Sequence, residues 1–157
     1  MASLIRPAAG LDDVAAARTL FQEYQRALGV DLCFQGFAEE LAGLPGEYAP
    51  PRGRLLLAES REDRALLGCV ALRPLDARTA EMKRLFLRPA ARGQGVGRRL
   101  VEAVMAEAET IGYACLRLDT LPSMRTAIAL YRELGFREIE PYCRNPVAGA
   151  LFLERAL

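Results

Sequence analysis

The sequence predicts a single α/β domain whose central sheet is mixed, mostly antiparallel and flanked by helices. Along the 157 residues, apolar segments of strand length alternate with amphipathic segments of helix length. Two apolar segments, residues 54–59 and 65–72, are joined by a charged turn and therefore form an antiparallel hairpin. A third, residues 80–87, leads through a glycine loop into a helix, which begins a parallel crossover. One domain, residues 1–157, accounts for the chain and buries roughly 70% of its unfolded surface.

The first third of the chain predicts one strand and two helices. Residues 3–6 form a short strand, Asp12 or Asp13 caps the helix that follows, and Gly29 ends it. A second short helix is expected over residues 34–41, and residues 43–53 hold too many prolines and glycines for regular structure. The apolar side chains that recur at helical spacing in the first helix are Val14, Ala17, Leu20, Phe21, Tyr24 and Leu28.

The rest of the chain after the glycine loop adds two helices and three strands. The first of these helices is amphipathic, and a glycine ends each helix. The strand between the helices completes the crossover and therefore runs parallel to residues 80–87. In order, the elements are a helix at 96–111, a strand at 114–119, a helix that starts at Pro122 or Ser123 and ends before Gly135, and strands at 136–139 and 150–154.

Composition excludes several classes of partner. A net charge of +1 gives no overall field that would attract nucleic acid or an anionic membrane. No apolar run reaches the ~18 residues of a membrane span, and the first residues contain no signal-peptide core, so a cytoplasmic location is expected.

Counts of reactive residues exclude several kinds of site. The chain has no histidine, which removes Ser-His-Asp and Cys-His nucleophiles and imidazole metal ligands. The four cysteines are widely spaced, and three lie in apolar stretches, which suits free core thiols rather than a metal site. Acid–base chemistry is left to carboxylates, tyrosines or water, and no metal is expected.

Residues 92–97, Arg-Gly-Gln-Gly-Val-Gly, form the glycine loop. Three glycines at alternate positions let a ligand approach the backbone, so N–H groups at the helix start can face an anion. Arg92, Arg98 and Arg99 lie near the positive end of the helix dipole, where a cation is unfavourable by roughly 0.3–1 kcal/mol. A bound polyphosphate would reverse that effect. The loop therefore predicts a phosphate ligand, and the alternative is a tight turn without one.

Two common phosphate loops do not match these residues. A P-loop needs Gly-Lys-Ser/Thr, whereas Gly97 is followed by Arg98 and Arg99. The dinucleotide fingerprint needs a glycine where Arg98 stands, although Asp119 lies where its acidic residue belongs. An ATP- or NAD-binding protein is therefore disfavoured.

The loop fits a different pattern, Arg/Gln-x-x-Gly-x-Gly/Ala, with Arg92, Gly95 and Gly97 at the defined positions. Residues 81–89 before it read Glu-Met-Lys-Arg-Leu-Phe-Leu-Arg-Pro, and residues 130–136 after it read Leu-Tyr-Arg-Glu-Leu-Gly-Phe. On these motifs the chain resembles the GNAT superfamily of acyl-CoA-dependent N-acyltransferases. The resemblance implies a GNAT-like fold, acetyl-CoA as cosubstrate, and loop amides that hold its pyrophosphate.

The resemblance implies two catalytic residues. Tyr131 would stabilise the departing thiolate, whereas its spacing alone indicates a core aromatic residue. Glu81 would deprotonate the amine, often through water, and the alternative is a strand-end carboxylate paired with Lys83 or Arg84.

The resemblance also implies how the coenzyme binds. The strand would bulge over residues 85–87, so that its backbone meets the pantetheine arm and the thioester carbonyl. Many members carry an asparagine where this chain has Met124, and either the Ser123 hydroxyl substitutes for it or this contact is missing. The expected coenzyme-binding residues are Leu85, Phe86, Leu87, Arg92, Gly93, Gln94, Gly95, Val96, Gly97, Arg98 and Ser123.

The expected function is transfer of an acetyl group from acetyl-CoA to a primary amine, on a small molecule or a protein, by direct attack in a ternary complex. A non-catalytic acyl-CoA sensor would use the same loop, but the presence of both Tyr131 and Glu81 argues against it. The acceptor, the acyl-chain preference and the oligomeric state stay open, and an exposed closing strand would allow a homodimer. The residues that would make the acceptor side acidic and aromatic, and so suit a cationic amine, are Glu47, Tyr48, Glu81, Glu140 and Tyr142.

Overall fold

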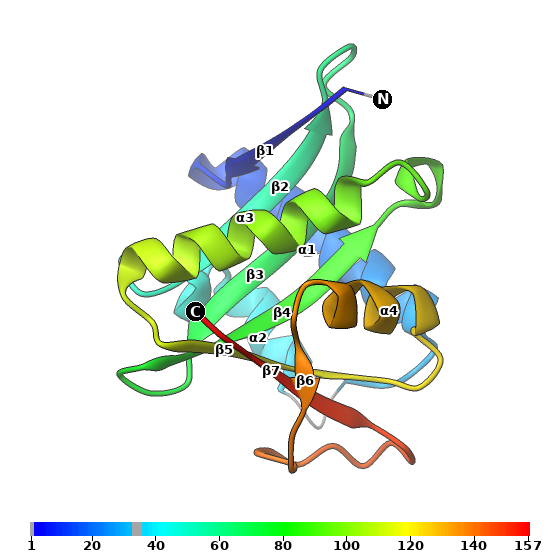
Figure 1. The fold of residues 1–157 in the computed structure, drawn as a ribbon. Coiled ribbons are helices and arrows are strands. Elements are labelled where there is room, and N and C mark those ends of the chain that lie inside the picture. Colours follow the sequence, from blue (N-terminus) through cyan, green and yellow to red (C-terminus); the bar gives the residue numbers. More distant parts are fainter. Residues whose placement is uncertain (1, 33–35) are drawn as a thin grey trace.

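A seven-stranded sheet runs through the computed structural model, which describes residues 2–32 and 36–157 (Figure 1). The strand order is β1-β2-β3-β4-β5-β7-β6, and β4 and β5 are parallel while the other neighbours are antiparallel. The strands are β1 (Ser3–Pro7), β2 (Arg54–Ser60), β3 (Leu66–Pro74), β4 (Thr79–Leu87), β5 (Cys115–Thr120), β6 (Arg137–Glu138) and β7 (Leu151–Ala156). The helices are α1 (Gly10–Leu28), α2 (Phe37–Gly43), α3 (Val96–Ile111) and α4 (Arg125–Glu133), with short 3-10 turns η2 (Gly46–Tyr48) and η3 (Pro89–Ala91).

Helices cover both faces of the sheet, α3 and α4 one face and α1 and α2 the other (Figure 1). On the α3 face, Leu100 and Val104 are fully buried against strand residues such as Leu72. On the α1 face, Leu20 and Phe21 are fully buried in a second apolar cluster. Burial of each such side chain contributes about 1.5–3 kcal/mol. The two clusters therefore hold the sheet between its helices.

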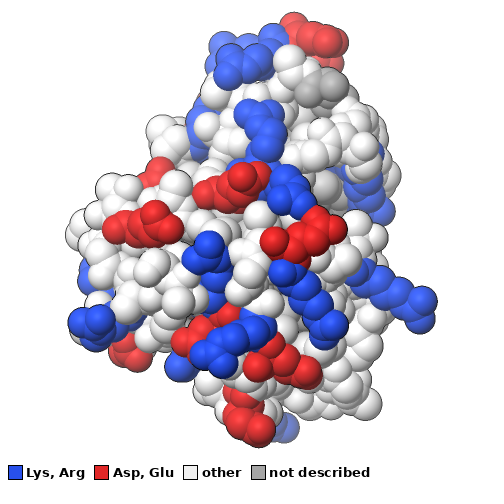
Figure 2. Space-filling model, viewed as in Figure 1, with Lys and Arg blue, Asp and Glu red and all other residues white. Residues whose placement is uncertain are grey.

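Charged side chains are interspersed on the face seen in Figure 2, where acidic and basic residues alternate over the surface. This distribution agrees with the net charge of +1. Within residues 2–32 and 36–157, no helix is long and apolar enough to span a membrane.

The predicted fold class is confirmed, as are the hairpin of β2 and β3 and the parallel pairing of β4 with β5. The start of the last helix was predicted two or three residues too early. Pro122 and Ser123 form a turn, closed by a hydrogen bond of 3.0 Å from the Met124 N–H to the Leu121 carbonyl, so α4 begins at Arg125. In α1 the start was predicted too late, because Asp13 accepts a 2.7 Å hydrogen bond from the Ala9 N–H and the helix begins at Gly10.

The segment between the second helix and β2 also differs from the prediction. It is not wholly irregular, because the Tyr48 N–H donates to the Pro45 carbonyl at 2.8 Å and closes η2. Cys69 is buried, as expected for a core thiol, whereas Cys115 is half-buried and Cys143 is exposed. The predicted helix start at residue 34, and Cys33, lie outside the described residues.

Candidate active site

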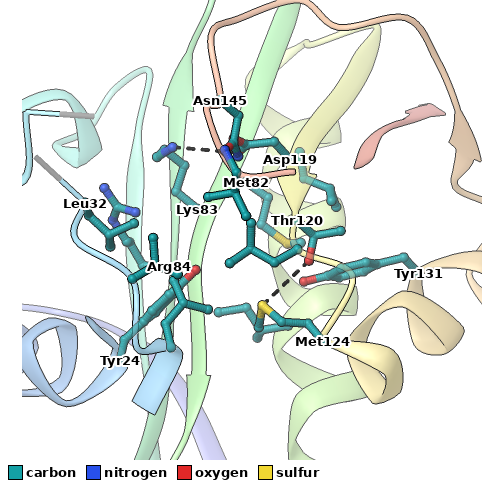
Figure 3. A pocket seen from close by; sticks show the side chains of 16 residues that line it. Tyr24, Leu32, Met82, Lys83, Arg84, Asp119, Thr120, Met124, Tyr131 and Asn145 are labelled. Carbon is teal, nitrogen blue, oxygen red and sulfur yellow. Dashed lines mark hydrogen bonds and ion pairs between the residues drawn. The ribbon is translucent and has the colours of Figure 1, made fainter. Parts of the chain in front are cut away.

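A cavity opens where β4 and β5 separate. The two strands pair only from Thr79–Cys115 to Glu81–Arg117. Beyond that point, residues 82–85 of β4 line one wall of a cavity, and residues 118–120 of β5 with Leu121 after it line the opposite wall (Figure 3). The end of α1 and the connection between β6 and β7 complete the lining. The cavity is small, about 40 Å³, and partly open. It is therefore too small for a whole coenzyme.

A β-bulge shapes the β4 wall of this cavity. Val70 of β3 lies opposite two residues of β4, Arg84 and Leu85, and the register shifts there by one residue. Arg84 has φ of 62°, in the left-handed region that residues with side chains rarely adopt. A bulge frees backbone groups from the ladder. The expected bulge is present, but it lies at residues 84–85, at the start of the expected segment 85–87.

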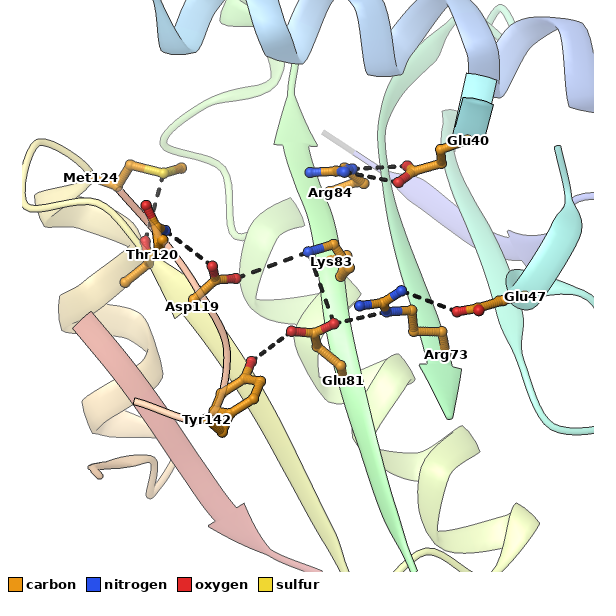
Figure 4. Close-up of polar contacts among 11 residues, drawn as sticks. Glu40, Glu47, Arg73, Glu81, Lys83, Arg84, Asp119, Thr120, Met124 and Tyr142 are labelled. Carbon is orange, nitrogen blue, oxygen red and sulfur yellow. Dashed lines mark hydrogen bonds and ion pairs between the residues drawn. The ribbon is translucent and has the colours of Figure 1, made fainter. Parts of the chain in front are cut away.

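Arg84 also ties the bulge to α2. Its guanidinium donates two hydrogen bonds to Glu40, of 2.9 and 2.8 Å (Figure 4). It also lies 5.1 Å from the centre of the Phe37 ring. The Arg84 side chain is only 2% exposed, so this ion pair is almost fully shielded from water. Sequence reasoning did not find this role, because Glu40 lies 44 positions away and no motif connects the two residues.

Tyr131 lies on the opposite wall of the cavity, on α4. The residue is 4% exposed and lines the cavity (Figure 3). Its ring centre lies 5.7 Å from that of Phe136. Burial raises the pKa of Tyr131 above its ordinary value. The hydroxyl therefore stays protonated at neutral pH and is able to donate a hydrogen bond. The structure places Tyr131 at the opening, and its catalytic role stays a prediction.

Glu81 is the last β4 residue paired with β5, and its carboxylate is 1% exposed. One oxygen, Oε1, accepts a hydrogen bond of 2.8 Å from Arg73, and the other, Oε2, accepts one of 2.6 Å from the Tyr142 hydroxyl (Figure 4). Burial raises the pKa of Glu81, but Lys83, Tyr142 and Arg73 together outweigh burial and lower the pKa below its ordinary value. Glu81 is therefore an ionised carboxylate at neutral pH.

The residues that the sequence predicted for the acceptor side lie in different surroundings. Tyr142 reaches Glu81, as described, whereas Tyr48 is 4% exposed and packs edge-on against Phe21 in the α1 cluster. Glu47 is exposed and pairs with Arg73 at 3.0 Å, and Glu140 is exposed. Two of the expected acidic groups, Glu47 and Glu81, are therefore paired with Arg73.

Glycine backbone conformations shape the loop between β4 and α3. Gly93 and Gly95 have φ of 76° and 80°, and a Cβ at either would meet no heavy atom of the described residues within 4 Å. A Cβ at Gly97 would lie 3.3 Å from Leu87, so the start of α3 lies close to the end of β4. As far as the structure describes the chain, α3 has no side-chain cap and its first turn carries no acidic residue. Its first N–H groups are therefore suited to an anion.

Two side chains of the loop donate hydrogen bonds to nearby backbone carbonyls. The Gln94 amide donates to the Ala90 carbonyl at 3.0 Å, and Arg92 donates to the Leu87 carbonyl at 3.2 Å. Both side chains are exposed, while Val96 is buried in the α3 cluster. The open side of the loop is therefore lined by backbone and by exposed arginines.

Two other expected contact residues lie at α4 or its neighbours. Arg98 forms an ion pair with Glu133 of α4. Ser123 is exposed in the turn before α4, and its hydroxyl bonds to no other residue within the described ranges. Met124 stands where many members of the family carry an asparagine, and it lines the cavity. Its sulfur accepts a hydrogen bond of 3.6 Å from the Thr120 hydroxyl.

Comparison with known proteins identifies the family of this chain. The family model described as acetyltransferase (GNAT) family matches residues 17–136. The chain belongs to the GNAT acetyltransferase family. An uncharacterised N-acetyltransferase of Schizosaccharomyces pombe is 40% identical over 144 residues, which cover 91% of this chain and 86% of the relative. An IAA acetyltransferase of Azospirillum brasilense is 38% identical over 142 residues, 88% of each chain.

Solved structures agree on the fold. An acetyltransferase from Streptococcus agalactiae has a TM-score of 0.79 at 21% identity, over 99% of this GNAT chain and 98% of that one. A phosphinothricin acetyltransferase from Sinorhizobium meliloti, in complex with AcCoA, has a TM-score of 0.73 at 19% identity, over 100% and 89% of the two chains. The protein is an acyltransferase of this family.

Proposed function

We propose that this GNAT protein transfers an acetyl group from acetyl-CoA to a primary amine by direct attack within a ternary complex. The observation that carries the proposal is the opening between β4 and β5, which has Glu81 at its apex and Tyr131 on its α4 wall. Relatives named as N-acetyltransferases support the reaction class, and neighbours of the same fold that contain acetyl-CoA support the cosubstrate.

The loop and β4 fit the coenzyme. The open backbone faces of Gly93 and Gly95 and the uncapped start of α3 are suited to its pyrophosphate, with Arg92 and Arg98 adding positive charge. The backbone of residues 85–87, which has no β5 partner because β4 pairs with β5 only as far as Glu81, would hold the pantetheine arm and the thioester carbonyl. Ser123 is the hydroxyl nearest in sequence to the missing asparagine position and would contact the coenzyme from the α4 side.

The reaction needs a neutral amine, because an aliphatic amine with a pKa near 10.4 is almost wholly protonated at pH 7. Glu81, with Tyr142 hydrogen-bonded to it, would accept that proton, through a water molecule. The amine then attacks the thioester carbonyl carbon, the C–S bond breaks, and the electron pair leaves on sulfur. Tyr131 would donate a hydrogen bond that strengthens as negative charge builds on that sulfur.

Initial-rate kinetics test this proposal. Free coenzyme A is measured while acetyl-CoA and the acceptor are varied together, across polyamines, amino acids, aminoglycosides and lysine peptides. Direct attack predicts thiol release that depends on one acceptor class and reciprocal plots that intersect. Parallel plots would indicate an acyl-enzyme, and release that is independent of every amine would indicate hydrolysis. Either result would contradict the proposal.

A further inference from the structure

Lys83 is the only lysine in a chain with 21 basic residues, and it lies in β4 at the cavity. Its side chain is 7% exposed. Its Nζ lies 3.9 Å from Glu81 Oε1 and 4.0 Å from Asp119 Oδ1, both too long for hydrogen bonds (Figure 4). Within residues 2–32 and 36–157 it makes no hydrogen bond, although an ammonium has three N–H groups to donate.

The neighbouring carboxylates are already occupied by other donors. Glu81 accepts from Arg73 and Tyr142, and Asp119 Oδ2 accepts a hydrogen bond of 3.0 Å from Asn145. The network therefore has two groups with unused capacity, the Lys83 ammonium and Asp119 Oδ1. Both residues line the cavity, from opposite walls (Figure 3).

The charges around the cavity balance in pairs. Arg84 pairs with Glu40 and Arg73 with Glu81 and Glu47, while Lys83 lies between Glu81 and Asp119. An acceptor with only a positive charge would be repelled by Lys83, and one with only a negative charge would be repelled by Asp119. A molecule that carries both charges complements the two walls together.

Apart from Asn145, the remaining wall of the cavity is mainly apolar. It comes from the end of α1, the residues after it and the connection between β6 and β7. The lining side chains are Tyr24, Leu28, Val30, Leu32 and Val147.

We infer that the acceptor is a zwitterionic amino acid with an apolar side chain, whose carboxylate binds the Lys83 ammonium and whose amino group lies toward Asp119. The inference rests on the proposed function and names the substrate class of that site. The carboxylate supplies the acceptors that Lys83 lacks, and the side chain of the amino acid lies against the apolar wall. The sequence predicted a cationic acceptor because several acidic residues were expected near it. Arg73 pairs with two of them, Glu47 and Glu81, so we infer a zwitterionic acceptor instead.

Matched acceptors with and without the carboxylate test the inference. Leucine, phenylalanine and methionine are each compared with the amine left after removal of the carboxylate, namely isoamylamine, phenethylamine and 3-methylthiopropylamine. Wild-type kcat/KM is expected to favour the amino acids by about 10- to 100-fold, the size of a hydrogen bond to a charged group. A ratio near one overturns the inference without any variant being made.

Variants then assign the preference to Lys83. In Lys83→Met the ratio of amino acid to amine is expected to fall toward one, and Lys83→Arg is expected to restore part of it. Because each ratio compares the same two acceptors, differences in intrinsic amine reactivity cancel between proteins. Arg61→Met, which removes a positive charge from the exposed β2–β3 turn, is the control and keeps the wild-type ratio. A ratio that survives in Lys83→Met contradicts the assignment.

Binding of acetyl-CoA separates failure of this inference from failure of the proposed function. If acetyl-CoA raises the melting temperature and other amines are acetylated, but these amino acids are not, the substrate class is wrong and the acetyltransferase stands. If acetyl-CoA does not bind, both fail.

Discussion

The Tyr142 hydroxyl donates a hydrogen bond of 2.6 Å to Glu81 Oε2, across 61 positions of sequence. From the same connection between β6 and β7, the Asn145 amide donates a hydrogen bond to Asp119. Glu81 and Asp119, the two carboxylates beside the β4–β5 opening, therefore both receive a hydrogen bond from one segment. That segment, which carries no motif, is one of the parts of the chain that lower the pKa of the proposed base.

Tyr142→Phe is expected to move the acidic limb of the pH–rate profile to higher pH. The hydrogen bond from Tyr142 is one of the interactions that lower the pKa of Glu81, so its removal raises that pKa. The measurement is kcat/KM against pH for wild type and variant with the best acceptor. An unmoved limb in Tyr142→Phe would show that Glu81 does not govern the rate.

Glu81→Gln is expected to flatten the acid dependence of stability. The folded-state pKa of Glu81 lies below its ordinary value, so the carboxylate stabilises the fold above the unfolded pKa and loses this effect as the pH falls through the folded pKa. The free energy of unfolding is measured by urea denaturation from about pH 5 to about pH 3. It should fall more steeply in wild type than in Glu81→Gln, and parallel curves would contradict the lowered pKa.

Tyr131→Phe is expected to lower kcat by about 100-fold, the effect of losing one donor to a developing charge. Affinity for acetyl-CoA should not change, because the ring stays in place at the cavity wall. Calorimetry and turnover are measured on the same preparation. The control is Tyr113→Phe, which removes another tyrosine hydroxyl, one bonded to the Arg52 carbonyl at 2.7 Å, far from the cavity lining. Equal turnover in Tyr131→Phe and Tyr113→Phe would reject a role for Tyr131.

Gly95→Ala is expected to weaken acetyl-CoA binding, because it strains a backbone with φ of 80° and places a methyl group on the open face of the loop. Gly10→Ala is a matched control, since Gly10 also has φ of 80° and an open surrounding, but lies at the start of α1. Both variants should lose about 1–2 kcal/mol of stability from the left-handed conformation. Only Gly95→Ala should raise the Kd for acetyl-CoA, and equal Kd values would remove the loop from the site.

Local patterns in the sequence were sufficient for most of the fold. The β2–β3 hairpin follows from its charged turn, and the parallel β4–β5 pair follows from the handed crossover through α3. Boundaries were less predictable where side chains compete for backbone groups. The hydrogen bond of Asp13 with Ala9 extends the start of α1, and the Pro122–Ser123 turn moves the start of α4 later in the chain. Neither effect is visible in the spacing of apolar residues.

The candidate site was predictable in its motifs but not in its network. Tyr131 and the glycine loop carry recognisable spacing, so the sequence alone could single them out as candidates. The partners of Glu81, namely Arg73 and Tyr142, come from β3 and from the β6–β7 connection, and only the assembled sheet brings them together. The unusual position of Lys83 depends equally on Asp119 of β5, which faces it across the opening.

The most direct test of acetyl transfer at this opening follows the acetyl group itself. The protein is incubated with acetyl-CoA labelled with heavy carbon in the acetyl group and with leucine or the best acceptor from the panel, and both acceptor and protein are analysed by mass spectrometry. The account predicts label in an amide of the acceptor, one equivalent for each free thiol, and much less of it with Tyr131→Phe. Thiol released without labelled amide, or label that stays on the protein, would contradict it.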